Sequence, residues 1–342
     1  MKRIIFLLLL FAAYDAESQT LGGNAVFNFL SQPNTAQLAA LGSINVSSIS
    51  NDVGLAFSNP SLLRDSMHQQ ISSSFYSFAE GVKQYGFHTA LHLNNIQSNL
   101  GIGVQFLDYG TITQTDASGN ILGNFRPSDY VVQLMYSKSY KENWWVGVTS
   151  KFINSNYGMY RSSGLAFDVG LAYYEKDNQL QVSIVAKNMG RQLKSYNGSG
   201  TKEELPFDLQ AGVTKRLLNA PLQFSITAHH LHRFDVFYND TLFNVQEGDT
   251  RFGANNTFQK LMAHLVFSTD IFLSNQFQIT AALNLMRRQS LNAYNITNGL
   301  NGFSLGFGVL LNKLQIRYAT GFYQQNLFHQ VSLNFNLKGD PL

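Results

Sequence analysis

The chain has 342 residues, of which 13% are charged, and its formal net charge is +3. This charged share is about half of the roughly 25% found in ordinary soluble proteins, and so small a net charge gives no reason to expect nucleic-acid binding. The sequence contains no cysteine, which excludes disulfides, thiolate metal sites, cysteine catalysis and a lipid-anchored lipoprotein.

The N-terminus has the composition of a secretion signal. Lys2 and Arg3 precede the apolar run 4–13, and small residues that suit a signal peptidase surround Ser18. The apolar run is too short to cross a bilayer as a helix. We therefore expect a signal peptide over 1–18, cleaved near Ser18, and an exported mature chain.

The segment 19–68 differs from the rest of the mature chain. The stretch 35–42 predicts a short helix that stops at Gly42, and Asn59-Pro60 marks a break before another helical turn. We interpret this segment as a partly helical, plug-like unit. It is expected to pack inside or beneath a barrel formed by 69–342.

Beyond this segment, large apolar residues alternate with small or polar ones. Phe303, Leu305 and Phe307, for example, are separated by serine and glycine. A period of two sends successive side chains to opposite faces of a strand, and an apolar outside with a polar inside is typical of an outer-membrane barrel. About fourteen segments of suitable length carry the pattern: 69–79, 84–94, 98–108, 129–139, 144–154, 164–174, 179–187, 207–216, 222–232, 258–268, 276–286, 302–311, 313–321 and 328–337. The predicted fold class is all-β, a transmembrane antiparallel β-barrel of about 14 strands.

The connections between these segments alternate in length. Every second one is short, and most of those between them are longer, notably 109–128, 188–206, 233–257 and 287–301. Bacterial barrels have short periplasmic turns and long external loops. The alternation therefore predicts an outer-membrane location, with both ends of the barrel domain in the periplasm.

Three charged residues lie within predicted strands. Asp168 shares the lumen face of its strand, and Lys151 and Lys187 are placed in neighbouring segments. A charge facing lipid is costly at mid-depth, so we expect ion pairs in the lumen that brace the wall. The alternative is a charged permeation path.

One histidine cluster stands out, at the end of a predicted strand that leads into the longest loop. It consists of His229, His230 and His232, of which His230 and His232 share a strand face, so a two-ligand metal site of these two is geometrically possible. We favour a solvated barrel rim, because no carboxylate pairs clearly with the cluster. No nucleophile elbow, metalloprotease spacing or phosphate loop is present either. We therefore expect neither an enzyme nor a bound cofactor.

Positive and aromatic residues in the predicted external loops are the candidates for partner binding. They are Arg251, Arg287, Arg288, Phe237 and Tyr238. Such arginines can contact lipopolysaccharide phosphates or an acidic partner face. The alternative is that they only keep the loops solvated.

Short motifs concentrate near the start of the mature chain. They are Leu21-Gly22-Gly23-Asn24, Phe27-Asn28-Phe29-Leu30, Pro33, Ala36, Ala39-Ala40-Leu41-Gly42, Asp52-Val53, Leu55-Ala56-Phe57 and Asn59-Pro60-Ser61-Leu62-Leu63. This pattern resembles the start of the PorQ family of the type IX secretion system of Bacteroidota. Its later part resembles the pattern shared with PorV and, more distantly, with FadL-type barrels.

The resemblance implies a barrel without enzymatic activity that belongs to a cell-surface attachment complex. The implied partners are a PorZ-like surface protein, which the barrel would hold at the membrane, together with PorU and PorV-like components and lipopolysaccharide. No family residue for the PorZ contact can be transferred to this sequence. Two other functions remain open, a FadL-like channel for hydrophobic small molecules with 21–68 as its plug, and a soluble periplasmic β-protein.

Overall fold

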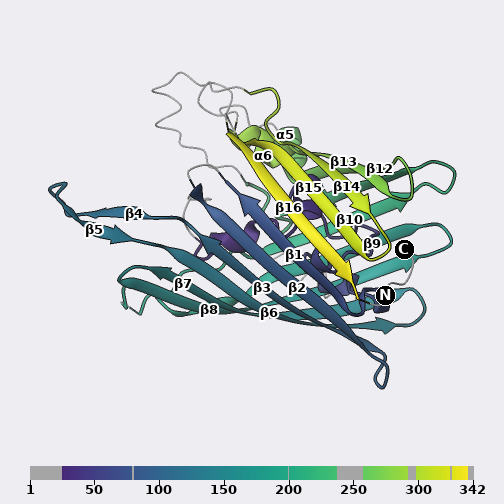
Figure 1. The fold of residues 1–342 in the computed structure, drawn as a ribbon, viewed down its shortest axis with the longest axis horizontal. Coiled ribbons are helices and arrows are strands. Elements are labelled where there is room, and N and C mark those ends of the chain that lie inside the picture. The colour runs from purple at the N-terminus through teal and green to yellow at the C-terminus, as the bar shows by residue number, and fades with distance from the viewer. Residues whose placement is uncertain are drawn as a thin grey trace.

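The computed structural model describes residues 25–78, 81–198, 200–236, 257–291, 298–323 and 326–337. Fourteen strands form a closed antiparallel barrel in the order β1-β16-β15-β14-β13-β12-β11-β10-β9-β8-β7-β6-β3-β2 (Figure 1). The predicted fold class is thereby confirmed. None of the helices in the described ranges has the length and apolar character needed to cross a membrane.

The strands of the barrel have lengths close to those predicted. Their bounds are β1 Gln70–Ser77, β2 Lys83–Leu93, β3 Ser98–Asp108, β6 Ser128–Tyr140, β7 Trp144–Tyr157, β8 Tyr160–Glu175, β9 Leu180–Lys194, β10 Asp208–Arg216, β11 Leu222–Ala228, β12 Leu265–Phe272, β13 Phe277–Asn284, β14 Phe303–Leu310, β15 Leu314–Tyr323 and β16 Asn326–Asn336. Strand β14 shows how alternation builds the wall. The outward Phe303, Leu305 and Phe307 are exposed, whereas the intervening Ser304 is buried in the lumen. An apolar outside of this kind matches the lipid-facing surface of a membrane barrel.

The two ends of the barrel differ as the connections predict. The longer connections lie at the end that we call the outer end, and the short turns lie at the opposite, periplasmic end. One long connection folds into a separate hairpin of β4 (Ile112–Thr115) and β5 (Ile121–Phe125), which projects well beyond the barrel (Figure 1). Strands β7, β8 and β9 also run further toward the outer end than predicted, so the loop expected between β7 and β8 is mostly strand and the first part of the loop 188–206, expected after β9, is strand as well.

Two predicted strand boundaries are wrong near the outer end. The first half of the predicted strand 258–268 is helix α5, Thr257–Ala263, and β12 begins only at Leu265. Phe258 and Leu261 are three residues apart, which places them on one face of a helix but on opposite faces of a strand, so their spacing was a signal for the helix. A second helix, α6 (Leu285–Leu291), begins where a strand was predicted to end, and it contacts α5.

The N-terminal segment lies inside the barrel as a series of short helical turns. These are η1 Asn28–Ser31, α2 Ala36–Ala40, α3 Val53–Ala56, η2 Pro60–Leu62 and η3 Asp65–Met67. Helix α2 is the predicted one, with the Thr35 side chain accepting from the Leu38 backbone N–H at its start. Gly42 follows its end with φ of +83°, a left-handed conformation that glycine adopts without strain. We refer to residues 25–67 as the plug.

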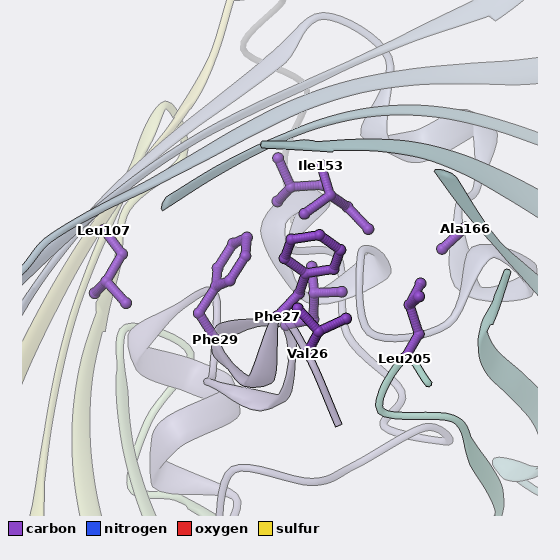
Figure 2. Packing of buried hydrophobic residues seen from close by; sticks show 9 residues of the cluster. Val26, Phe27, Phe29, Leu107, Ile153, Ala166 and Leu205 are labelled. Carbon is purple, nitrogen blue, oxygen red and sulfur yellow. The ribbon is translucent and has the colours of Figure 1, made fainter. Parts of the chain in front are cut away.

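The hydrophobic core lies between the plug and the wall. In one cluster, Val26, Phe27 and Phe29 of the plug pack against wall residues that include Leu107 and Ile153 (Figure 2). A second cluster joins other plug side chains to β2, β6 and β8, and it contains Val53, Ala56, Phe57, Leu62, Leu63, Met67, Ala90, Met135 and Ala172. The plug is thus part of the folded interior of the barrel.

Candidate functional site

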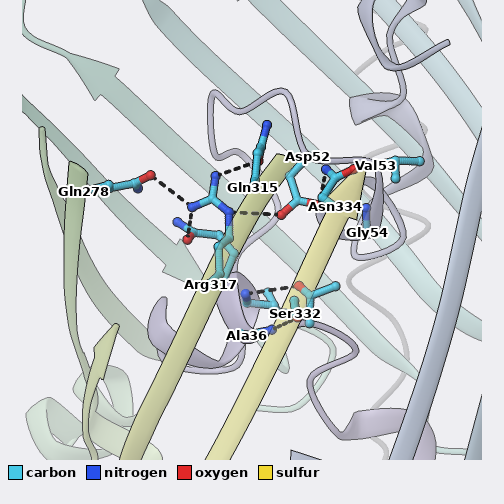
Figure 3. A network of polar contacts seen from close by, with 12 residues as sticks. Ala36, Asp52, Val53, Gly54, Gln278, Gln315, Arg317, Ser332 and Asn334 are labelled. Atoms are coloured by element: carbon cyan, nitrogen blue, oxygen red, sulfur yellow. Dashed lines mark hydrogen bonds and ion pairs between the residues drawn. The ribbon is translucent and has the colours of Figure 1, made fainter. Parts of the chain in front are cut away.

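A buried ion pair joins the plug to the barrel wall. Arg317 of β15 lies with its Nε 3.4 Å from Oδ2 of Asp52, and these side chains are 6% and 1% exposed (Figure 3). The same guanidinium donates to Gln37 at 2.5 Å, to Gln278 at 3.0 Å and to Gln315 at 3.2 Å. Asp52 also accepts from the Gly54 backbone N–H and so caps helix α3. One charged pair therefore links two parts of the plug to strands β13 and β15.

Further polar contacts attach the plug around the barrel. The Ser47 and Thr214 hydroxyls lie 2.9 Å apart, and the Ala36 backbone N–H donates to Ser332 at 2.8 Å (Figure 3). Glycines in the strands allow the plug backbone to approach the wall closely. A Cβ built on Gly147 would lie 2.4 Å from the carbonyl carbon of Pro60. The small and polar lumen face noted in the sequence is therefore the surface on which the plug packs.

The predicted ion pair in the lumen is confirmed for two of its three residues. Lys151 Nζ lies 2.6 Å from Asp168 Oδ2, and both side chains are almost fully buried. Asn188 completes the group, because its backbone N–H donates to Asp168 and its side chain accepts from Lys151, each at 2.8 Å. Lys187 makes no ion pair with Asp168 in the described chain, although it lies near enough to interact with both Lys151 and Asp168, and it is in register with Asp208 on the neighbouring strand.

A cavity of about 460 Å³ separates the plug from the wall near the outer end. On the plug side it is lined by Leu38 and Asn45, and on the wall side by Lys187 and Asp208. Its lining mixes apolar and charged groups. It is therefore suited to a small amphipathic molecule, an ion or water rather than to a purely apolar solute.

The histidine cluster borders this cavity. Strand β11 ends at Ala228, and His229 that follows it is fully buried, so a solvated rim is the wrong interpretation for that residue. His229 Nδ1 lies 2.5 Å from His230 Nδ1. The His230 backbone N–H donates to Asp208 at 2.6 Å, and its Nδ1 lies 3.8 Å from Asp208 Oδ2. Asp208 is the carboxylate that sequence reasoning missed. The pairing register of β10 with β11, which cannot be read from the sequence, brings Asp208 next to the histidines.

Burial keeps these imidazoles neutral. It lowers the pKa of His229 to about 3, and the neighbouring His230 and His264 lower it further. Burial also lowers the pKa of His230, against the opposing effect of the Asp208 carboxylate. Neutral rings offer an unprotonated nitrogen, which is the form that accepts a hydrogen bond or binds a metal ion.

The predicted partner-binding residues are only partly within the described chain. Arg251, Phe237 and Tyr238 lie outside the described residues. Arg287 and Arg288 lie on α6, where their guanidinium groups sit 5.1 Å and 5.6 Å from the ring centres of Tyr323 and Phe303. Both arginines thus contact the rim of the barrel itself. Their contact with a partner stays a prediction.

The projecting hairpin supplies a surface that the sequence reasoning did not single out. Ile121 and Leu122 of β5 are 74% and 62% exposed, and Ile112 of β4 is exposed beside them. Met159, in the turn between β7 and β8, is 81% exposed at the same end. The signal in the sequence is the pair of apolar residues at 121–122, within a connection that was predicted as loop.

Comparison with solved structures places this fold among outer-membrane channels. The toluene transporter TodX of Pseudomonas putida aligns with a TM-score of 0.52 and 10% identity, over 89% of this chain and 97% of that one. The CymD monoaromatic hydrocarbon channel aligns with a TM-score of 0.51 and 11% identity, over 90% and 97%. No protein-family model and no curated protein sequence matches the chain.

Identities this low show the fold alone. The described chain is a closed fourteen-stranded barrel with a plugged lumen, and its fold is similar to that of TodX and CymD. This similarity of fold agrees with the broader of the two resemblances seen in the N-terminal motifs. The narrower resemblance, to the PorQ family, stays a prediction.

Proposed function

We propose that this barrel is a non-enzymatic anchor that holds a surface protein at the outer membrane through its external end. The observation that carries the proposal is the projecting β4–β5 hairpin, with Ile112, Ile121 and Leu122 exposed (Figure 1). Ile121 and Leu122 are consecutive strand residues and Ile112 pairs with Phe125, so the hairpin exposes apolar side chains on both faces and along its length. Exposed apolar surface on a projecting element is typical of a protein-interaction site. A hairpin held beyond the barrel presents them to a partner outside the cell.

The interior supports a structural role. The plug is joined to the wall by the buried Arg317–Asp52 pair and by packing in which strand glycines such as Gly147 accommodate its backbone. An apolar solute crossing this lumen would have to separate buried charges and break polar contacts, which is costly. A rigid, filled barrel suits a protein whose work is done at its outer surface.

The particular partner follows from the PorQ resemblance and is part of the proposal. A PorZ-like surface protein would dock on the external end, within a complex that also contains PorU and PorV-like components and that acts on cargo near lipopolysaccharide. The loop residues Arg251, Arg287, Arg288, Phe237 and Tyr238 are the candidates to extend the contact from the hairpin. This attachment complex is the specific form of the anchoring function.

The test is affinity purification from detergent-solubilised outer membranes, with wild type compared to Ile121→Asp/Leu122→Asp. The variant should lose a co-purifying surface protein that deletion of the gene also releases from the cell. Asn124→Asp is the matched control, because it adds a charge at an exposed polar position of the same hairpin. Heat-dependent gel mobility confirms that each barrel is folded. If gene deletion left every surface protein in place and cargo attachment intact, the anchoring function would be wrong.

A second candidate is a channel for hydrophobic small molecules. The comparisons favour it over the attachment role, because the neighbours TodX and CymD are a toluene transporter and a monoaromatic hydrocarbon channel. The cavity beside the plug adds a compartment of about 460 Å³ at the outer end. In this function the plug would move to open a route.

Reconstituted uptake separates the two functions. Because the chain has no cysteine, Ser47→Cys/Thr214→Cys would place a single disulfide between plug and wall, where the two hydroxyls now lie 2.9 Å apart. Toluene or fatty-acid flux that is present with reductant and lost on oxidation would support the channel. Absence of flux in both states, with a folded barrel, would support the anchor.

A further inference from the structure

The histidine cluster at the outer end of the lumen has the composition of a metal site. We propose that Asp208, His229 and His230 bind a divalent transition-metal ion of the zinc class. This inference is independent of the anchoring function and of the channel. It rests on the positions of the three side chains in the folded barrel.

The three residues place their ligand atoms together. Each offers one ligand atom, and these atoms all lie within 4.8 Å of one another. Two histidine nitrogens and one carboxylate oxygen are ligands that zinc takes at about 2.0–2.2 Å, and three protein ligands leave a fourth position open. The two Nδ1 atoms lie 2.5 Å apart and share a hydrogen bond. Two nitrogens that bind one tetrahedral zinc ion lie about 3.3 Å apart, so the rings would separate by about 1 Å to take the ion.

Burial supplies a second observation that points to a ligand. His229 is fully buried, and its Nε2 has no hydrogen-bond partner among the described residues. An unpartnered buried polar atom costs free energy unless a further group satisfies the ring. His232 Nδ1 is also buried without a described partner.

The surrounding chain holds the ligands in place. His264, just before β12, contacts the His229 carbonyl through Nδ1 at 2.7 Å and the Phe234 carbonyl through Nε2 at 3.2 Å. Asp208 is oriented by the His230 backbone N–H and by the Gln210 side chain, whose amide donates to it at 2.6 Å. Such supporting contacts orient ligands in known metal sites.

The open coordination position faces the cavity beside the plug. His230, His232 and Arg233 line that cavity, and Lys187 lies across it. The two cationic side chains lower the affinity of the site for a metal ion, whereas Asp208 raises it. The same cations favour an anionic fourth ligand, such as a carboxylate or hydroxide, over a neutral one.

Metal binding to the purified full chain tests the site. The protein is taken from outer membranes in detergent with an affinity tag that contains no histidine, stripped with a chelator and titrated with Zn²⁺ against a chromophoric chelator. We expect one Zn²⁺ per chain. Replacement by Co²⁺ should give the visible absorption of a four-coordinate nitrogen and oxygen site.

Three variants decide which residues bind. Asp208→Asn keeps an oxygen that can accept from the His230 backbone, and His230→Ala removes a partly exposed ring. Each of these two substitutions should weaken Zn²⁺ binding by at least about tenfold. Even the loss of a residue that only supports a ligand typically lowers metal affinity by about 10- to 100-fold. His92→Ala, which removes a histidine near the periplasmic end, should leave the affinity unchanged. Heat-dependent gel mobility confirms folding.

Two results would overturn the site. One is a folded wild-type chain that binds no stoichiometric Zn²⁺. The other is binding that Asp208→Asn and His230→Ala leave as tight as in wild type, which would show that Zn²⁺ binds elsewhere on the chain. A folded Asp208→Asn variant keeps the test valid even if the His230→Ala variant does not assemble.

Discussion

Replacing Asp52 with asparagine tests whether the plug is held in the lumen by charge. Asparagine has nearly the same shape as aspartate and remains a good helix N-cap, so the cap on α3 through the Gly54 N–H is kept. The change removes only the negative charge opposite Arg317. The arginine is then left buried with three neutral glutamine acceptors.

The expected loss of stability follows from the burial of the pair. Both side chains are within a few per cent of full burial, and removing one partner of a buried ion pair costs about 3–5 kcal/mol. The glutamine contacts remain, so we expect the lower end, about 3 kcal/mol. That corresponds to about a hundredfold change in the folding equilibrium, since every 1.4 kcal/mol is tenfold.

The assay is urea unfolding in lipid vesicles, read by gel mobility, combined with proteolysis of the plug in the folded state. Asp65→Asn is the matched control, because this aspartate lies in the same segment but is exposed. The double variant Asp52→Asn/Arg317→Gln removes both charges of the pair and should recover part of the loss. The recovery is incomplete because Asp270, which also attracts Arg317, stays buried. The reasoning fails if Asp52→Asn costs less than about 1 kcal/mol, the scale of a single neutral hydrogen bond, or if the double variant is no more stable than the single one.

Two further changes test the packing of the plug and the lipid-facing wall. Gly147→Ala should expose the plug to protease and lower the urea midpoint of unfolding, because the new Cβ would lie 2.4 Å from the Pro60 carbonyl carbon. Gly308→Ala is the control: its Cβ would meet only ordinary contacts, the nearest at 3.4 Å, so this variant should behave as wild type. Equal protease resistance of the two variants would contradict the close approach. Leu134→Arg, at the centre of β6 on the outer face, should cost about 2–4 kcal/mol in vesicles, whereas Tyr140→Arg at the periplasmic end should cost about 0–1 kcal/mol. Similar costs at both positions would mean that β6 does not cross the bilayer.

The wall of the barrel was predictable because its pattern is local. Each strand has one face toward lipid and one toward the lumen, so the alternation of Phe303, Leu305 and Phe307 with small residues is enough to identify β14. The signals that start and stop a helix are local as well, and α2 begins after Thr35 and ends before Gly42 as expected. Strand ends were less predictable, as α5 shows: the i, i+3 spacing of Phe258 and Leu261 is that of a helix, yet they stand directly before a run with the alternation of a strand.

The candidate sites depend on residues that the sequence separates widely. Asp52 meets Arg317 only when the barrel encloses the plug, and Asp208 meets His229 only when the register between strands β10 and β11 is set. The strand register and the path of the plug are decided by many contacts together. No short segment of the sequence encodes those contacts. The sequence by itself therefore determined the kind of barrel and the membrane it belongs to. The tertiary structure decided which buried charges pair, which histidines share a carboxylate and which hairpin reaches beyond the wall, because those contacts exist only between strands.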